Sequence, residues 1–168
     1  PLAQLYGIDG DFGDALERVE MPAERAAGVL GHASVLAAHA HSDQTSPVLR
    51  GLFVRANLLC QEFPPPPPNA GNVPEVDPEA TTRERFDQHA ADPSCASCHK
   101  FIDPVGYGFE HFDAIGQWRE RENGAPIDAT GDLRDVEGLG TETEAPFDDL
   151  GELGRVIARS DRAHECIT

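Results

Sequence analysis

The chain has 168 residues and a formal net charge of −17, from 30 acidic and 13 basic side chains. So large a negative excess argues against a nucleic acid or an anionic membrane surface as a partner, and it favours a basic protein partner. No run approaches the roughly 18 apolar residues of a membrane-spanning helix, so we expect no membrane span. Because the chain begins with proline and not methionine, we expect a piece of a longer protein, accompanied by its remaining domains or by other subunits.

Two helices are predicted in the N-terminal part, residues 1–63. The segment 22–40 is rich in alanine and spaces its aliphatic residues at the helical period, which predicts one helix. Ser46 followed by Pro47 is typical of a helix N-cap with proline in the first turn. A second helix should therefore run from there to about Cys60.

Residues 64–80 are predicted to be a connection. Five consecutive prolines at 64–68 cannot continue a helix and favour a stiff polyproline II segment. Polar residues, glycine and two more prolines follow. We expect a rigid strap across the domain, with a ligand for an SH3-type module as the alternative.

Residues 81–168 are predicted to contain short helices and one hairpin. Thr81 and Glu84 fit a capping box, which predicts a helix that ends near Pro93. Pro93 then suits the first turn of a short helix, and residues 103–108, with one proline and two glycines, predict a turn-rich wrap.

The remaining C-terminal elements are a small β-hairpin and a last helix. Alternation and turn residues at 127–133 predict the hairpin. Asp148 or Asp149 should cap the helix, whose apolar face contains leucine, valine and isoleucine. The predicted fold is mostly α-helical and irregular, in one compact unit with a proline-rich strap.

The run Cys95-Ala-Ser-Cys98-His99 carries the chemistry. A C-x-x-C-H sequence is the attachment site of a c-type haem: the two thiols form thioether bonds, and the histidine is the proximal ligand of the iron. A zinc site would need a second pair of ligands, and a thioredoxin-like dithiol would follow a strand. We therefore expect one covalent haem c in a cytochrome c-like helical domain.

A haem also needs an apolar surrounding, a partner for the second nitrogen of its histidine and donors for its propionates. An aromatic stretch that directly follows the motif could supply the apolar surrounding. The backbone carbonyls around Pro104 are close enough in sequence to accept a hydrogen bond from His99. Arg119 is the first candidate for a propionate, with Arg121 behind it. The residues expected at the haem are Phe101, Ile102, Pro104, Val105, Tyr107, Phe109, Phe112, Trp118 and Arg119.

The sixth ligand of the iron has several candidates. His89 is the nearest in sequence and is separated from His99 by a helix break. His41 or His39 could reach the iron from the N-terminal half, and Met21 is the only methionine. An open sixth position is the remaining alternative.

The other two cysteines, Cys60 and Cys166, are predicted to form a disulfide, because haem attachment to C-x-x-C-H implies an oxidising compartment. The bridge would close a loop of about a hundred residues and contribute up to ~4–5 kcal/mol in the chain-entropy model. The alternative is two reduced core cysteines.

Nearly the whole chain resembles the C-terminal cytochrome region of large multidomain cytochrome-containing proteins of planctomycetes and myxobacteria. The matching stretches are His-Ala-Ala-Asp-Pro-Ser-Cys-Ala-Ser-Cys-His at 89–99, Asp-Pro-Val-Gly at 103–106 and Phe-Glu-His-Phe-Asp-Ala-Ile-Gly-Gln-Trp-Arg at 109–119, with 25–36, 44–51 and 58–60 upstream. The resemblance implies a secreted or periplasmic bacterial protein with covalent haem and further domains. His89 matches the family pattern. The family usually has methionine where this chain has Ile102, a position too near His99 to reach the opposite face of a haem.

These features predict electron transfer through a single haem to or from a basic redox partner protein, and they assign no catalytic residue. A haem enzyme module with an open iron, similar to a peroxidase, is the first alternative. A segment in which haem only stabilises the structure is the second. The spin state of the iron would separate the first two.

Overall fold

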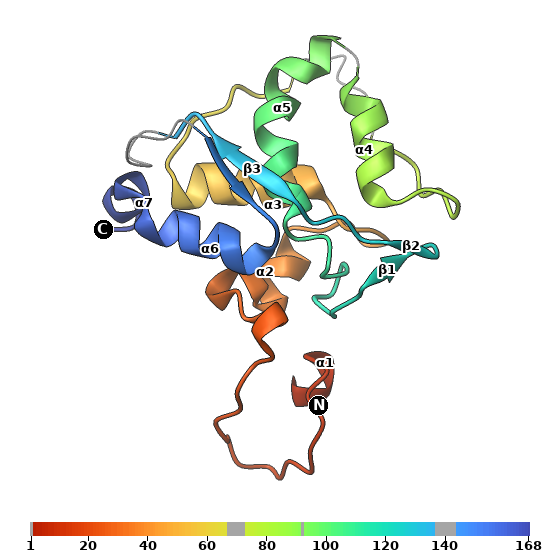
Figure 1. Cartoon of the computed structure of the whole chain (residues 1–168), viewed down its shortest axis with the longest axis vertical. Coiled ribbons are helices and arrows are strands. Elements are labelled where there is room, and N and C mark those ends of the chain that lie inside the picture. The colour runs from red at the N-terminus through yellow and green to blue at the C-terminus, as the bar shows by residue number, and fades with distance from the viewer. Residues whose placement is uncertain (1, 67–72, 92, 137–143) are drawn as a thin grey trace.

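The computed structural model describes residues 2–66, 73–91, 93–136 and 144–168, except for the side chain of residue 94 (Figure 1). The described part is mostly α-helical, as predicted, and it contains two small antiparallel sheets instead of the single predicted hairpin. Its elements are α1 (Leu2–Leu5), η1 (Ala23–Arg25), η2 (Gly28–Gly31), α2 (Ala33–Ala38), α3 (Pro47–Leu52), η3 (Phe53–Leu58), α4 (Thr82–Ala90), α5 (Pro93–Tyr107), β1 (Arg121–Glu122), β2 (Ala125–Pro126), β3 (Gly131–Arg134), β4 (Glu144–Phe147), α6 (Leu150–Arg159) and α7 (Asp161–Ile167).

The N-terminal half contains one prediction that is wrong and one that is confirmed. The single helix expected over 22–40 is replaced by η1, η2 and α2, because Gly28 adopts a φ of +58°, which interrupts a helix. The helix expected after Ser46 is present: the Ser46 hydroxyl accepts a hydrogen bond from Leu49 N–H at 3.2 Å, and Pro47 opens α3. It continues through the π-helical turn η3 to Leu58.

Helix α5 crosses α3 at the centre of the molecule, backbone against backbone. A β-carbon built on Gly51 of α3 would lie 2.2 Å from the carbonyl oxygen of Ile102 in α5. Only glycine at this position therefore allows so close an approach. The contact leaves the C-terminal half of α5 in the core and its N-terminal half at one edge of the molecule, beside α4 (Figure 1).

The α4–α5 hairpin begins as predicted and then differs. Thr81 and Glu84 form the capping box at the start of α4. The turn-rich wrap expected over 103–108 is wrong, because α5 continues through Pro104 to Tyr107. A proline inside a helix removes one backbone hydrogen bond. Packing against α3 and against Gly131, whose β-carbon would lie 2.0 Å from the Pro104 carbonyl oxygen, holds the helix here.

The β-structure is present but differs in position from the predicted hairpin at 127–133. Strands β1 and β2 form a hairpin around Asn123 and Gly124, whose φ values of 49° and 84° are typical of a type I′ turn. The predicted C-terminal strand residue Leu133 lies in β3, but it pairs with Ala145 of β4. Ile127 lies outside both sheets.

The last helices complete the core. Asp149 caps α6 as predicted, by accepting a hydrogen bond from Glu152 N–H at 2.8 Å. The core cluster brings together η2, α2, η3, α5, β3, β4, α6 and α7. Its buried members are Leu30, Leu36, Val54, Leu59, Val105, Phe109, Phe112, Leu133, Val136, Phe147, Leu150, Leu153, Ile157 and Ala163.

Two buried arginines connect α3 and η3 to the rest of the chain, which the sequence pattern did not indicate. Arg50 donates to the carbonyls of Phe112 at 2.7 Å and Asp113 at 2.6 Å, just beyond the end of α5. Desolvation lowers the pKa of Arg50 to about 10, so its guanidinium stays charged at neutral pH. Arg55 donates to the carbonyl of Phe101 within α5.

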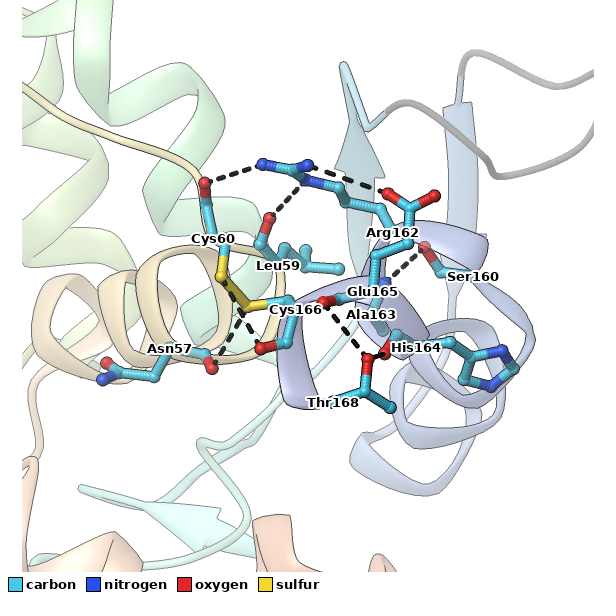
Figure 2. Close-up of a disulfide and its surroundings, with 10 residues drawn as sticks. All are labelled: Asn57, Leu59, Cys60, Ser160, Arg162, Ala163, His164, Glu165, Cys166 and Thr168. Carbon is cyan, nitrogen blue, oxygen red and sulfur yellow. Dashed lines mark hydrogen bonds and ion pairs between the residues drawn. A yellow bond between two sulfur atoms is a disulfide. The ribbon is translucent and has the colours of Figure 1, made fainter.

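The predicted disulfide Cys60–Cys166 is present and joins the end of η3 to α7 across 106 residues (Figure 2). Arg162 reinforces the junction by donating to the carbonyls of Leu59 and Cys60, each at 3.0 Å. The C-terminal helix α7 is thus joined covalently to the central helical region.

The predicted connection at 64–80 is described only in part, since residues 67–72 lie outside the described residues. Its C-terminal portion packs on the domain: Gln44 donates to the Pro74 carbonyl at 3.1 Å and Arg85 to the Glu75 carbonyl at 3.0 Å. In the described part of the chain, no helix is both long and apolar enough to cross a membrane.

Candidate functional site

The C-x-x-C-H motif lies in the first two turns of α5, next to the end of α4 (Figure 1). Residues spaced three and four apart lie on one side of a helix. Cys95, Cys98 and His99 therefore share one face of α5. All three are half-buried.

His99 is held by a carboxylate one helical turn further along. Its Nδ1 lies 3.0 Å from Oδ1 and 2.9 Å from Oδ2 of Asp103. The Asp103 side chain is only 4% exposed, against 18% for His99. Since a carboxylate accepts hydrogen bonds, Nδ1 is the protonated nitrogen, and Nε2 is left to coordinate a metal.

The charges of this pair depend on each other. The hydrogen bond to Asp103 raises the pKa of His99, while burial opposes this effect. Burial raises the pKa of Asp103, while the hydrogen bond from His99 opposes that. The geometry favours the form in which the proton is on Nδ1 and the carboxylate accepts it.

Sequence reasoning expected a backbone carbonyl near Pro104 to accept from His99 and missed the Asp103 side chain. The expected wrap would have freed those carbonyls, whereas the observed helix places the side chains of residues 99 and 103 one above the other. An i, i+4 spacing of histidine and aspartate is the signal that would have identified the pair. Pro104 lies inside the helix with its carbonyl against Gly131.

The histidine candidates for a sixth ligand are placed differently. The ring of His89, at the end of α4, lies edge to face with the His99 ring, with centroids 5.4 Å apart. The His39 ring packs on Phe53, with centroids 4.4 Å apart. Its Nδ1 lies 2.8 Å from the Val35 carbonyl. Among the candidates, the structure brings His89 into contact with His99.

His41 and Met21 lie in segments without regular structure. His41 follows α2, and its backbone N–H donates to the Gln44 carbonyl at 2.9 Å. Met21 precedes η1 and is partly exposed.

Below the motif, Tyr107 fastens α5 to α4. Its hydroxyl donates to Asp87 at 2.6 Å, and the Arg83 guanidinium lies 4.5 Å from the centre of its ring. Burial raises the pKa of Tyr107, and so does the hydrogen bond to Asp87. Tyr107 lies on the same face as His99, two turns along the helix, so these contacts position α4 beside the motif.

The other predicted haem contacts are spread over the domain. Phe101 follows His99 by two positions, which turns it toward the far side of α5. There it lines a groove with Lys100, Arg134, Asp135 and Glu144. Ile102, Val105 and Phe109 are buried, and the carbonyl of Ile102 meets Gly51 of α3.

Phe112 and Trp118 pack near the opposite end of α5. Their rings meet edge to face, and Arg25 of η1 lies over Trp118. Arg119 pairs with the buried carboxylate of Glu110 at 2.9 Å and with Glu122 at 3.1 Å. Arg121 donates to the carbonyl of Gly124 in the β1–β2 hairpin. The structure does not bring Phe112, Trp118 or Arg119 to the motif, because they join the N-terminal half and α4 to the end of α5.

The donor set at the motif fits a covalently attached haem. Two thiols one turn apart can each form a thioether bond, and the histidine on the same face keeps Nε2 for the iron. The hydrogen bond from Nδ1 to Asp103 is the kind of support that metal-bound histidines usually have.

The fold and site define a small, mostly helical domain with a C-x-x-C-H motif at the exposed end of its central helix. Residues 26–122 match the family model described as PSCyt3, protein of unknown function (DUF1588). The match covers more than half of the chain, so the chain belongs to this cytochrome-like family. No curated protein matches the chain, and no solved structure does.

Proposed function

We propose that this chain is a c-type cytochrome domain that carries one covalent haem c and transfers electrons. The observation that carries the proposal is the position of Cys95, Cys98 and His99 on one face of α5, with His99 Nδ1 bonded to Asp103. The haem would supply an iron that changes reversibly between two oxidation states.

Each residue of the motif would have a separate role in binding the haem. Cys95 and Cys98 would fasten the porphyrin, and His99 would bind the iron through Nε2. His89 is our candidate for the sixth ligand because it is the candidate that lies beside His99; its ring would have to move away from the His99 ring to admit a porphyrin between them. The contacts of Tyr107 with Asp87 and Arg83 would hold α4, and therefore His89, against α5.

One observation favours a haem enzyme as the second candidate. A buried carboxylate on the proximal histidine strengthens that ligand as a donor, which suits an iron that must reach high oxidation states. An enzyme of this kind would keep its sixth position open and show a high-spin spectrum. Electron transfer predicts a low-spin spectrum with no binding of added ligands.

The surroundings of the protein are part of the proposal. The net charge of −17 suits a basic redox partner. Haem attachment and the Cys60–Cys166 disulfide both suit the periplasm or exterior of a bacterium. The family resemblance suggests further domains in the same protein.

Covalent haem retention tests the proposal. The protein should be produced in a bacterial periplasm equipped for haem attachment, then extracted with acidic acetone and run on a denaturing gel. The haem should stay with the polypeptide, since thioether bonds survive both treatments. The double change C95A/C98A should abolish retention.

The matched control is C60S/C166S, which also removes two cysteines but only breaks the disulfide. It should retain the haem. Release of the porphyrin from the unsubstituted protein would contradict the proposed function.

A further inference from the structure

The acceptor for His99 in this fold is a buried carboxylate and not a backbone carbonyl. Both oxygens of Asp103 lie within 3.0 Å of Nδ1. The continuation of α5 through Pro104 is what puts the side chain there, one turn from His99. A charged acceptor forms a stronger hydrogen bond than a neutral carbonyl, and a low-dielectric setting weakens that bond less than water would.

From this geometry we infer that Asp103 is a positioning residue that sets the reduction potential of an iron bound at His99; the inference rests on the proposed function. By accepting the Nδ1 proton, Asp103 fixes the tautomer and the orientation of the ring. It also increases the electron density on the imidazole and makes Nε2 a stronger donor. A stronger axial donor stabilises oxidised iron more than reduced iron, so Asp103 keeps the potential low.

The electrostatic effect of neighbouring charged groups must be distinguished from the effect of the Asp103 hydrogen bond. Asp87 and His89 of α4 both act electrostatically on Asp103. Asp87, however, is bonded to the Tyr107 hydroxyl at 2.6 Å. Asp87→Asn is therefore a matched control: it removes the same charge from the same neighbourhood, keeps a side-chain oxygen that accepts the hydrogen bond of the Tyr107 hydroxyl, and leaves the hydrogen bond of His99 intact.

The test is a redox titration of the haem-loaded protein and of its Asp103→Asn and Asp87→Asn variants, after covalent haem retention has been checked for each. Asp103→Asn should favour reduced iron by about tenfold or more, which corresponds to a rise of about 59 mV per tenfold change for a one-electron couple. Asp87→Asn should change the potential by clearly less. A role of Asp103 in folding alone would lower stability and leave the potential unchanged.

Equal shifts in the two variants, or no shift in Asp103→Asn, would overturn the inference while leaving the proposed function intact. Absence of covalent haem from the unsubstituted protein would overturn both.

If Asp103→Asn fails to fold, the unsubstituted reduced protein provides the test. The Nδ1 proton of His99 should then exchange slowly with solvent in an NMR experiment, because it is bonded to a buried carboxylate. Fast exchange would overturn the inference.

Discussion

A β-carbon at Gly106 of α5 would lie 2.0 Å from the carbonyl oxygen of Pro47 at the start of α3. The two backbones therefore touch at this point, and the contact between Gly51 and Ile102 repeats the arrangement one turn along α3. Because these contacts hold α5 across α3, they also fix the direction in which the motif end of α5 points.

Gly106→Ala should destabilise the fold by about 1–3 kcal/mol, since its methyl group has to push a backbone carbonyl away. Urea denaturation gives the free energy of unfolding. Gly154→Ala in α6 is the control, because its β-carbon would meet no atom closer than 3.7 Å. That change should stabilise the helix by roughly 0.5–1 kcal/mol. Equal stability of the two variants would contradict the close contact of α3 with α5.

Loss of the Cys60–Cys166 disulfide should destabilise the protein by about 2–5 kcal/mol, because the bridge restricts a long loop in the unfolded chain. Denaturation of the unsubstituted protein and of C60S/C166S, each with and without reductant, measures this. Reductant should bring the unsubstituted protein to the stability of the variant and have no effect on the variant itself. If reductant leaves the stability of the unsubstituted protein unchanged, the disulfide does not contribute to it, and the prediction is wrong.

The capping box of α4 should make stability depend on acid. Two hydrogen bonds to Glu84 lower its pKa below the ordinary value of 4.5. The backbone N–H of Thr81 has the larger effect, and the Thr81 hydroxyl has the smaller one. The ionised Glu84 therefore stabilises the fold above the unfolded pKa, and this contribution is lost as the pH falls through the lower folded value. The stability difference between the unsubstituted protein and Glu84→Gln should be largest near neutral pH and shrink in acid.

Two further variants complete this experiment. Glu79→Gln removes the same charge from an exposed position just before the cap, leaves the capping box intact, and should change stability at neutral pH by less than Glu84→Gln does. Thr81→Ala should cost about 1 kcal/mol at neutral pH. A difference for Glu84→Gln that stays constant from pH 7 to pH 3 would show that the carboxylate does not act through its charge.

His89→Ala tests the sixth ligand in the haem-loaded protein. If His89 binds the iron, its loss should convert a low-spin spectrum to a high-spin one and raise the reduction potential, because a strong imidazole donor is removed. His39→Ala is the control, since the His39 ring packs on Phe53. A silent His89→Ala with a spectral change in His39→Ala would move the ligand to the N-terminal half.

The sequence by itself determined the features that depend on neighbouring residues or on chemistry. The caps at Ser46, Thr81 and Asp149 follow from side chains that reach backbone N–H groups three residues away. The C-x-x-C-H motif needed only spacing, and the pairing of the two remaining cysteines followed from their number and from the oxidising compartment that haem attachment implies.

Only the tertiary structure decided what depends on long-range packing. Local signals at Pro104 favoured a turn. Helix α5 nevertheless continues past Pro104, because its contacts with α3 and Gly131 stabilise it there. That continuation places Asp103 on His99. The partner of β3 and the positions of Phe112 and Trp118 depend likewise on segments far apart in the chain, whose contacts no local pattern specifies.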